Sequence, residues 1–149
     1  YIDRMKSHCE ANNDFWEILL LLQDQNFIDY CDNHSSFMHG DLSLENIIQT
    51  DKGMFLIDPI YKEDNWSSYL LDITKMLHSY RKYSRMFEYE VFLNGWLRTH
   101  NLDEYVLRVL EVTQWIRVVK YIKDPELKKE IHQKTKLLLN EVIQNNIIK

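Results

Sequence analysis

The residues that could do chemistry lie close together in the first half of the chain. One segment reads Phe-Met-His-Gly-Asp-Leu-Ser-Leu-Glu-Asn over 37–46, and a second reads Leu-Ile-Asp-Pro over 56–59. Asp41 begins the loop that leads to Asn46, and Asp58 follows the second apolar run. An amide oxygen beside a carboxylate can ligate Mg²⁺ when phosphates and waters complete the octahedron. A further carboxylate could orient a hydroxyl nucleophile that attacks a phosphoryl group, or accept its proton.

A β-hairpin is predicted to bring two of these groups together. The short apolar runs NIIQ and MFLI are rich in strand-forming residues, and the four-residue turn between them ends in a glycine that can supply a positive φ. In the register that pairs Gln49 with Met54, Asn46 lies opposite Ile57. Asn46 and Asp58 are therefore expected to emerge together at the open end of the hairpin, where Asp41 also converges. The structural alternative is that Asp41 caps a turn while the other two residues end strands.

The joint pattern resembles the catalytic loop of the kinase-like phosphotransferases. Protein kinases carry H-R-D-L-x-x-x-N followed by D-F-G. The small-molecule branch, which includes aminoglycoside phosphotransferases, choline and ethanolamine kinases and related sugar kinases, typically has H-G-D-x-x-x-x-N followed by I-D. This chain has HGDLSLEN and then LIDP. The resemblance implies a mainly α (α+β) fold, a helical kinase-like C-terminal lobe in which one small β-hairpin carries the metal-binding residues.

The resemblance also implies a role for each matching residue. Asp41 would be the catalytic aspartate that orients the acceptor hydroxyl and takes its proton. Asn46 and Asp58 would bind the Mg²⁺ that accompanies ATP or another nucleoside triphosphate. His39 would pack and hydrogen-bond so as to hold the two metal-binding segments together. Gly40 stands where protein kinases have arginine, so regulation by a phosphorylated activation loop is not expected.

A second aspartate downstream is expected to have a structural role. Asp72 lies in a Leu-Asp-Ile sequence on a predicted helix and, by the resemblance, would brace the catalytic loop through its backbone amides. Only thirteen residues separate Asp72 from Asp58, which is too few for a long activation segment and favours a small acceptor over a protein substrate. Pro59 departs from most relatives and removes a backbone donor after the metal aspartate.

Half of the expected enzyme is missing from this sequence. It contains no strand-rich nucleotide lobe, no glycine-rich phosphate loop and no V-A-I-K-like lysine before the catalytic loop. Residues 1–149 are therefore expected to form the C-terminal lobe alone, with the N-terminal nucleotide lobe as its missing partner. Because nucleotide binding normally needs both lobes, the isolated lobe is expected to have weak or no kinase activity.

The acceptor is expected to be a small molecule with a hydroxyl group, such as an aminoglycoside, choline, ethanolamine or a sugar. Aromatic and acidic side chains after Asp58 could bind a cationic acceptor through cation–π contacts and ion pairs. These side chains are Tyr61, Trp66, Tyr69, Trp96 and Tyr105, with Glu63, Asp64, Glu88 and Glu90. The alternative is that the aromatic residues belong to the core and the acidic residues lie on solvated helix faces.

Composition narrows the class of protein. With three glycines and two prolines in 149 residues, a phosphate-loop or dinucleotide-binding motif and a proline-rich disordered tail are excluded. Net charge is −9 over residues 1–75 and +4 over 76–149, without a dense basic cluster, so no nucleic-acid partner is expected. No apolar run is long enough for a membrane span, and two cysteines without metal-ligand spacing favour free thiols and a reducing cytoplasm.

Helical periodicity accounts for most of the remaining chain. After a short charged start, Asn13 is predicted to cap a helix over 14–22 that either continues or restarts towards Tyr30. Further helices are predicted over 66–82, 85–99, 102–122 and 125–146, and the hairpin is the only strong β signal. Core-facing stripes are predicted on the last two helices. Their residues are Val106, Val109, Leu110, Ile116, Val119 and Ile122, then Leu127, Ile131, Leu138, Val142 and Ile143.

Two other functional classes stay open at this point. The first is a non-enzymatic kinase-like module that serves binding or assembly within a larger transferase, although such a module has no chemical need for Asp41, Asn46 and Asp58 together. The second is a metal-dependent hydrolase that uses the same carboxylates. The hydrolase would turn over without a nucleotide, and the chain lacks the histidine-rich cluster typical of many such enzymes.

Overall fold

The computed structural model describes residues 1–60 and 66–147. Most of the described residues are helical, and two small antiparallel sheets of two strands each pair β1 with β4 and β2 with β3. In chain order the elements are α1 (Ile2–Asn12), α2 (Glu17–Leu22), α3 (Gln25–Asn33), β1 (Ser35–Phe37), the 3₁₀ helix η1 (Leu44–Asn46), β2 (Ile47–Thr50), β3 (Gly53–Leu56), β4 (Trp66–Ser68), α4 (Leu70–Lys82), α5 (Met86–His100), α6 (Glu104–Val119) and α7 (Pro125–Ile147). The prediction of a mainly α fold with one hairpin at the candidate site is confirmed.

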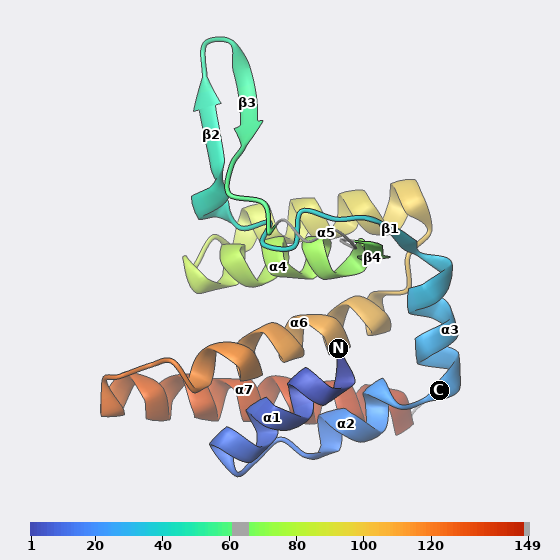
Figure 1. Ribbon diagram of the computed structural model, residues 1–149, viewed down its shortest axis with the longest axis vertical. Helices are drawn as coiled ribbons and strands as arrows, with labels where there is room; N and C mark the ends of the chain where they lie inside the picture. The colour runs from blue at the N-terminus through green and yellow to red at the C-terminus, as the bar shows by residue number, and fades with distance from the viewer. Residues whose placement is uncertain (61–65, 148–149) are drawn as a thin grey trace.

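Helix α6 is the centre of the helical body. It packs against α4 on one side and α7 on the other, and α1 also lies against it (Figure 1). Eleven of its residues are buried, including five of the six that the sequence predicts for its core stripe. Leu77 of α4, Tyr89 of α5 and Leu139 of α7 complete the core around it. The core therefore lies on both faces of α6. Helix α4 lies between this core and the segment 38–60.

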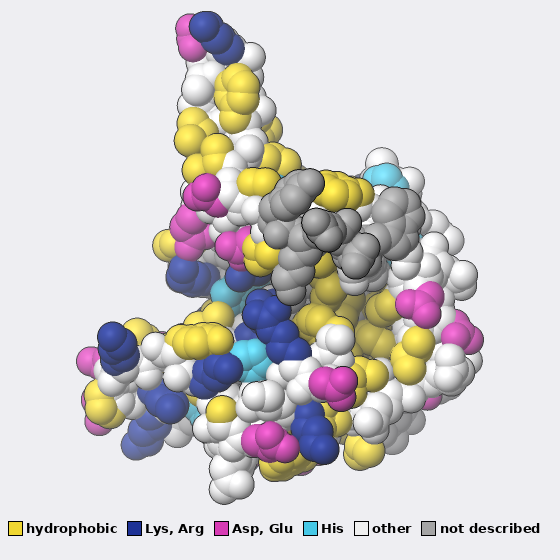
Figure 2. Space-filling view, viewed as in Figure 1, with side chains coloured by type: hydrophobic (Ala, Val, Ile, Leu, Met, Phe, Trp, Pro, Cys, Tyr) yellow, Lys and Arg dark blue, Asp and Glu magenta, His cyan; other side chains and the backbone are white. Residues whose placement is uncertain are grey.

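The β2–β3 hairpin stands out from the helical body (Figure 1). It pairs Gln49 with Met54 and Ile48 with Phe55, and the Ile57 N–H donates to the Asn46 carbonyl at 3.0 Å. The predicted register is thus confirmed. Apolar side chains are exposed on this ribbon, with Met54 71% and Phe55 49% accessible, and Figure 2 shows them as a hydrophobic surface along the hairpin.

Several predicted elements have other bounds. Residues 2–12 form a helix, and Asn13 ends that helix in a left-handed conformation instead of capping the next one. The hairpin is not the only β structure, because β1 pairs with β4 through Phe37 and Trp66. Three-residue strands lie below the length at which alternation of apolar and polar residues becomes visible in a sequence.

The other helices follow the periodicity more closely. Asp24 caps α3 by accepting from the Phe27 N–H at 3.1 Å, which resolves the break between the first two predicted helices. Helix α4 begins at Leu70, because 66–68 belong to β4. The core stripe predicted for α7 is wrong at Leu127, which is 47% exposed. The first turn of α7 extends beyond the end of α6, which covers only the later turns.

Candidate functional site

A buried carboxylate on α4 holds the start of the candidate catalytic loop. Asp72 accepts the His39 N–H at 2.6 Å through Oδ2 and the Gly40 N–H at 2.9 Å through Oδ1. Asp72 lies in the first turn of α4, where the helix dipole also favours a negative charge. The predicted bracing of the loop through its backbone amides is confirmed.

The same two loop residues connect to the segment that follows the hairpin. The Ile60 N–H donates to the His39 carbonyl at 2.9 Å. Gly40 has φ +83°, and a Cβ at this position would lie 3.1 Å from the Cβ of Ile60. Glycine is therefore required here both for its backbone conformation and for the close approach of Ile60. The loop before Asp41 and the segment after Asp58 are thereby held side by side.

Asp41 is fixed through both of its carboxylate oxygens. Oδ1 lies 3.0 Å from Nζ of Lys75 on α4, and Oδ2 lies 3.2 Å from Nδ2 of Asn46. The same Asn46 amide donates to the Asp41 carbonyl at 2.8 Å. The Asp41 side chain is 40% exposed. Asp41 is thus oriented by two partners while one side of its carboxylate stays open to solvent.

Asn46 is positioned by the 3₁₀ helix η1, which lies on α4. The Leu44 N–H donates to Oγ of Ser79 at 3.0 Å, and that hydroxyl donates to Glu45 at 3.2 Å. Glu45 also accepts from Lys82 Nζ at 2.7 Å and from the Tyr83 hydroxyl at 2.6 Å. Burial alone would raise the pKa of Glu45, but these hydrogen bonds from Lys82 and Tyr83 hold the pKa far below its usual range. Glu45 therefore anchors the short turn that presents Asn46.

One face of α4 makes all of these contacts with the loop. Its side chains are spaced three, four and three residues apart, which places them along one side of a helix. The four are Asp72, Lys75, Ser79 and Lys82. The prediction from sequence assigned a role to Asp72 alone and missed the other three. The polar spacing that starts at Asp72 was the available signal.

Asp58 lies at the open end of the hairpin, next to the backbone pairing of Ile57 with Asn46. Its residue is exposed and has φ +54°, a left-handed conformation that aspartate adopts more readily than most residues. The hydrogen bond from Ile57 to Asn46 places Asp58 one residue beyond the paired end of the hairpin. Among the described residues, its side chain makes no hydrogen bond or ion pair with Asp41 or Asn46. The structure therefore joins Asp41 to Asn46 directly, and Asp58 through the backbone hydrogen bonds of Ile57 and Ile60 on either side of it.

His39 acts through its backbone in the described structure. Its N–H and carbonyl are the groups that bind Asp72 and Ile60. Both ring nitrogens are buried and have no hydrogen-bond partner among residues 1–60 and 66–147. The predicted connection between the two segments is present, but the side chain does not make it.

The arrangement offers a carboxylate that could accept a proton from a hydroxyl group, and two oxygens that could ligate a cation. The Asn46 amide nitrogen is engaged by Asp41, which leaves its amide oxygen for a cation, and Asp58 supplies an exposed carboxylate. Within the described residues, no group of three or more His, Cys, Asp or Glu could hold a metal ion. A cation at Asn46 and Asp58 would thus take most of its ligands from phosphates and water, as Mg²⁺ commonly does in nucleotide sites.

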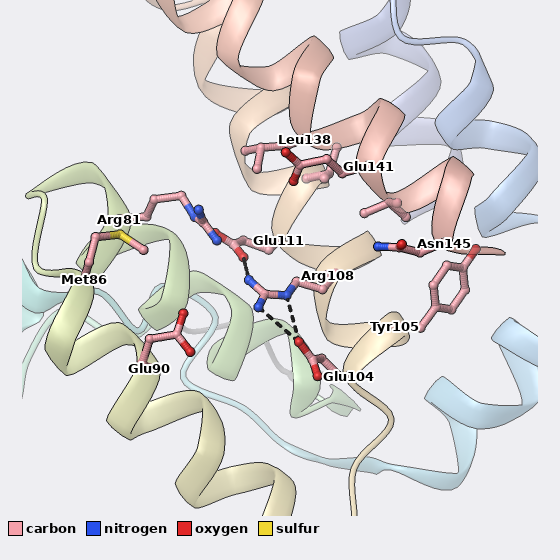
Figure 3. Close-up of a pocket in the computed structure, with 12 residues that line it drawn as sticks. Arg81, Met86, Glu90, Glu104, Tyr105, Arg108, Glu111, Leu138, Glu141 and Asn145 are labelled. Carbon is pink, nitrogen blue, oxygen red and sulfur yellow. Dashed lines mark hydrogen bonds and ion pairs between the residues drawn. The ribbon is translucent and has the colours of Figure 1, made fainter. Parts of the chain in front are cut away.

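A second polar region lies between α4, α5, α6 and α7, where a cavity of about 620 Å³ opens (Figure 3). At its floor Glu111 is 2% exposed and accepts from Arg81 Nε at 2.7 Å and from the Tyr89 hydroxyl at 2.7 Å. Arg108 lies between Glu111 and Glu104 and contacts both. Burial would lower the pKa of Arg81, but the Glu111 carboxylate raises it above its usual value. Both carboxylate oxygens of Glu111 are thus bound by side chains of the protein itself.

The residues suggested for acceptor binding divide into three groups. Tyr61, Glu63 and Asp64 lie outside the described residues, as does the side chain of Trp66. Tyr69, Trp96 and Tyr105 are partly buried against the hydrophobic core, and the Tyr69 and Trp96 rings lie 6.3 Å apart. Glu88 pairs with Arg85 at 2.7 Å, and Glu90 lines the second polar region. The core alternative is thus favoured for these three aromatic residues.

Comparison of the chain with protein families and with curated proteins gives no match to either. Across residues 1–60 and 66–147, none of the helices combines the length and the apolar composition needed to cross a lipid bilayer. Cys9 and Cys31 are both free thiols, and burial raises the pKa of each to about 11.

Proposed function

We propose that this chain is the catalytic-loop lobe of a phosphotransferase that moves a phosphoryl group from ATP, or another nucleoside triphosphate, to a hydroxyl of a small molecule. The observation that carries the proposal is the fixed Asp41 carboxylate beside Asn46. A turn-capping aspartate would have its oxygens occupied by backbone amides, whereas Asp41 is oriented by side chains and remains 40% exposed. A catalytic acceptor of a proton needs this combination of fixed orientation and access.

Each residue then has a defined part in the reaction. The hydroxyl oxygen of the acceptor forms a bond to the γ-phosphorus, and Asp41 accepts the hydroxyl proton. The bond between that phosphorus and the β–γ bridging oxygen breaks. Asn46 and Asp58 would hold Mg²⁺, which would offset the charge that develops on the phosphate oxygens. Asp72 holds the loop backbone through His39 and Gly40, so that Asp41 and the metal ligands keep their relative positions.

The exposed hairpin supports the proposal of an N-terminal nucleotide lobe as partner. A two-stranded ribbon with solvent on both faces is marginally stable alone, and further strands or a packed surface stabilise it. Ile48, Phe55 and Leu56 are 44%, 49% and 55% exposed, on the element that also leads to Asn46 and Asp58. A β-rich lobe seated there would cover these apolar groups and complete the nucleotide site, and the present chain alone would have weak or no activity.

The proposal is tested on the protein that carries both lobes. ATP and Mg²⁺ should raise its melting temperature in a thermal-shift titration, and Asp58→Ala should remove most of this increase. Asp41→Ala should lower phosphoryl transfer by orders of magnitude while the nucleotide-induced shift is retained. Glu130→Ala, at an exposed position on α7, is the control and should change neither. The absence of any nucleotide effect, or transfer by Asp41→Ala near the wild-type rate, would overturn the proposal and leave a non-enzymatic module.

A further inference from the structure

Among residues 1–60 and 66–147, Lys75 is the cationic group that contacts Asp41, and neither the motif nor the proposed reaction assigns it a role. It lies on α4, one helical turn after Asp72, and its Nζ is 3.0 Å from Oδ1 of Asp41. We propose that Lys75 is a positioning residue that fixes the plane of the Asp41 carboxylate together with Asn46. This inference rests on the proposed function of Asp41 as the group that receives the acceptor hydroxyl.

The geometry assigns one partner to each carboxylate oxygen. Lys75 contacts Oδ1, and the Asn46 amide contacts Oδ2 at 3.2 Å. A carboxylate held at only one oxygen can still rotate about its terminal torsion, which is broad for aspartate. Contacts at both oxygens restrict that rotation. Since each oxygen has two lone pairs, one on each remains for the acceptor hydroxyl.

The elements that carry the two partners are themselves held in place. Lys75 lies between Asp72 and Ser79 on α4, and both neighbours bind the loop that contains Asp41. Asn46 is fixed by the η1 turn, which Ser79 and Glu45 attach to the same helix. Helix α4 thus sets the distance between the two groups that orient Asp41. The contact between Asn46 and Asp41 also connects the acceptor site to the metal site, because Asn46 contacts Asp41 with its nitrogen and would face Mg²⁺ with its oxygen.

A contribution to stability alone does not account for the pair. Lys75 and Asp41 are 22% and 40% exposed, and ion pairs at such positions contribute little to the free energy of unfolding. Lys136 on α7 makes a comparable ion pair with Asp14 at 2.8 Å, with side-chain exposures of 54% and 23%. Both residues lie outside the loop that contains Asp41. Lys136→Met is therefore the matched control for Lys75→Met, since each removes one lysine of a partly exposed ion pair.

The first test needs no nucleotide and uses the present chain. The side-chain amide of Asn46, identified by its loss in Asn46→Asp, is followed by ¹⁵N-¹H NMR. Lys75→Met should shift and broaden this resonance because the Asp41 carboxylate becomes free to rotate. Lys136→Met should leave it unchanged, and Lys75→Arg should restore it in part. An unchanged Asn46 resonance in Lys75→Met, with dispersed backbone amides that show a folded chain, would overturn the inference.

The second test uses phosphoryl transfer by the protein with both lobes. Lys75→Met should lower kcat by about 10- to 100-fold with little change in the KM for ATP, because misplacing the hydroxyl acceptor affects the chemical step. Lys75→Arg should recover part of the loss, and Lys136→Met should keep kcat within a few-fold of wild type. If Asp41→Ala is inactive while Lys75→Met is normal, only the inference on Lys75 is wrong. If Asp41→Ala retains activity, the proposed function is wrong as well.

Discussion

Helix α4 carries a charged network on each of two sides, and the two networks differ in burial. Towards α6, Arg81 binds Glu111, whose side chain is 2% exposed and whose two oxygens are both engaged. Towards the loop, Lys75 binds Asp41, whose side chain is 40% exposed. The first network is closed around a buried charge, and the second leaves a carboxylate accessible.

This difference separates a structural role from a chemical one. Removing one member of a buried ion pair leaves the other as an uncompensated charge in the core, so the substitution is costly to stability. An exposed carboxylate held at both oxygens contributes little to stability and keeps lone pairs for a ligand. The region around Glu111 is therefore expected to respond to substitution through unfolding, and the region around Asp41 through binding and catalysis.

The largest effect on stability is expected at Glu111. Glu111→Gln leaves the half-buried Arg81 guanidinium without a carboxylate, and should lower the free energy of unfolding by about 3–5 kcal/mol. Urea denaturation followed by circular dichroism measures this loss. The control is Glu104→Gln on the same helix, where the carboxylate is 53% exposed and the loss should stay below about 1 kcal/mol. Equal losses for the two variants would contradict the contrast in burial.

Asp72 should give the next largest effect, because it belongs to the loop side but is buried. Asp72→Asn can accept only one of the two backbone N–H groups of His39 and Gly40 well, and should cost about 2–3 kcal/mol. Hydrogen exchange at these two amides should accelerate more than exchange in α6. If their exchange stays slow, another contact holds the loop and the bracing role is wrong.

The sequence alone predicted those parts of the site that follow from short-range geometry. The register of the hairpin could be predicted because a tight turn with Gly53 sets the pairing of Gln49 with Met54, and the placement of Asn46 follows. The bracing role of Asp72 came from resemblance, and its two hydrogen bonds bear it out. Catalysis and metal binding by Asp41, Asn46 and Asp58 stay predictions.

What the sequence did not reveal depends on contacts between distant segments. Lys75 meets Asp41 only because α4 packs against the loop, and a lysine on an amphipathic helix otherwise indicates a solvated face. The β1–β4 pair joins residues more than two dozen positions apart through three-residue strands. The α1 helix was missed because its apolar residues, Met5 and Cys9 among them, are few and lie between charged ones.

A pH-dependent loss of stability is expected from His78, which lies on α4 near Lys75 and packs against Trp115 of α6. Burial lowers its pKa to about 3, with a further effect of Lys75, and its ring packs 4.4 Å from that of Trp115. Since the unfolded pKa is near 6.5, the unfolded chain binds the proton more readily, and stability present above pH 6.5 is lost as pH falls towards 3. At pH 5 the loss from this group is about 2 kcal/mol.

Denaturation at pH 7.5 and pH 5 measures this dependence. His78→Phe should reduce the difference between the two free energies of unfolding by about 2 kcal/mol. His8, whose pKa burial lowers to about 4, remains in that variant and should keep part of the acid sensitivity. The same pH dependence in wild type and His78→Phe would show that His78 has the same pKa in the folded protein as in the unfolded chain.

The smallest effect, at Gly40, tests how the loop side is assembled. Gly40→Ala introduces a Cβ 3.1 Å from the Cβ of Ile60 at a residue with φ +83°, and should cost about 1–2 kcal/mol. Gly95 on α5 is the matched control, because no neighbouring atom lies within 4 Å of the added Cβ. Gly95→Ala should raise the melting temperature, as alanine stabilises a helix by up to about 1 kcal/mol. If Gly40→Ala also raised it, the approach of Ile60 to the loop would not limit the residue at position 40. The side-by-side placement of the two segments that carry Asp41 and Asp58 would then need another cause.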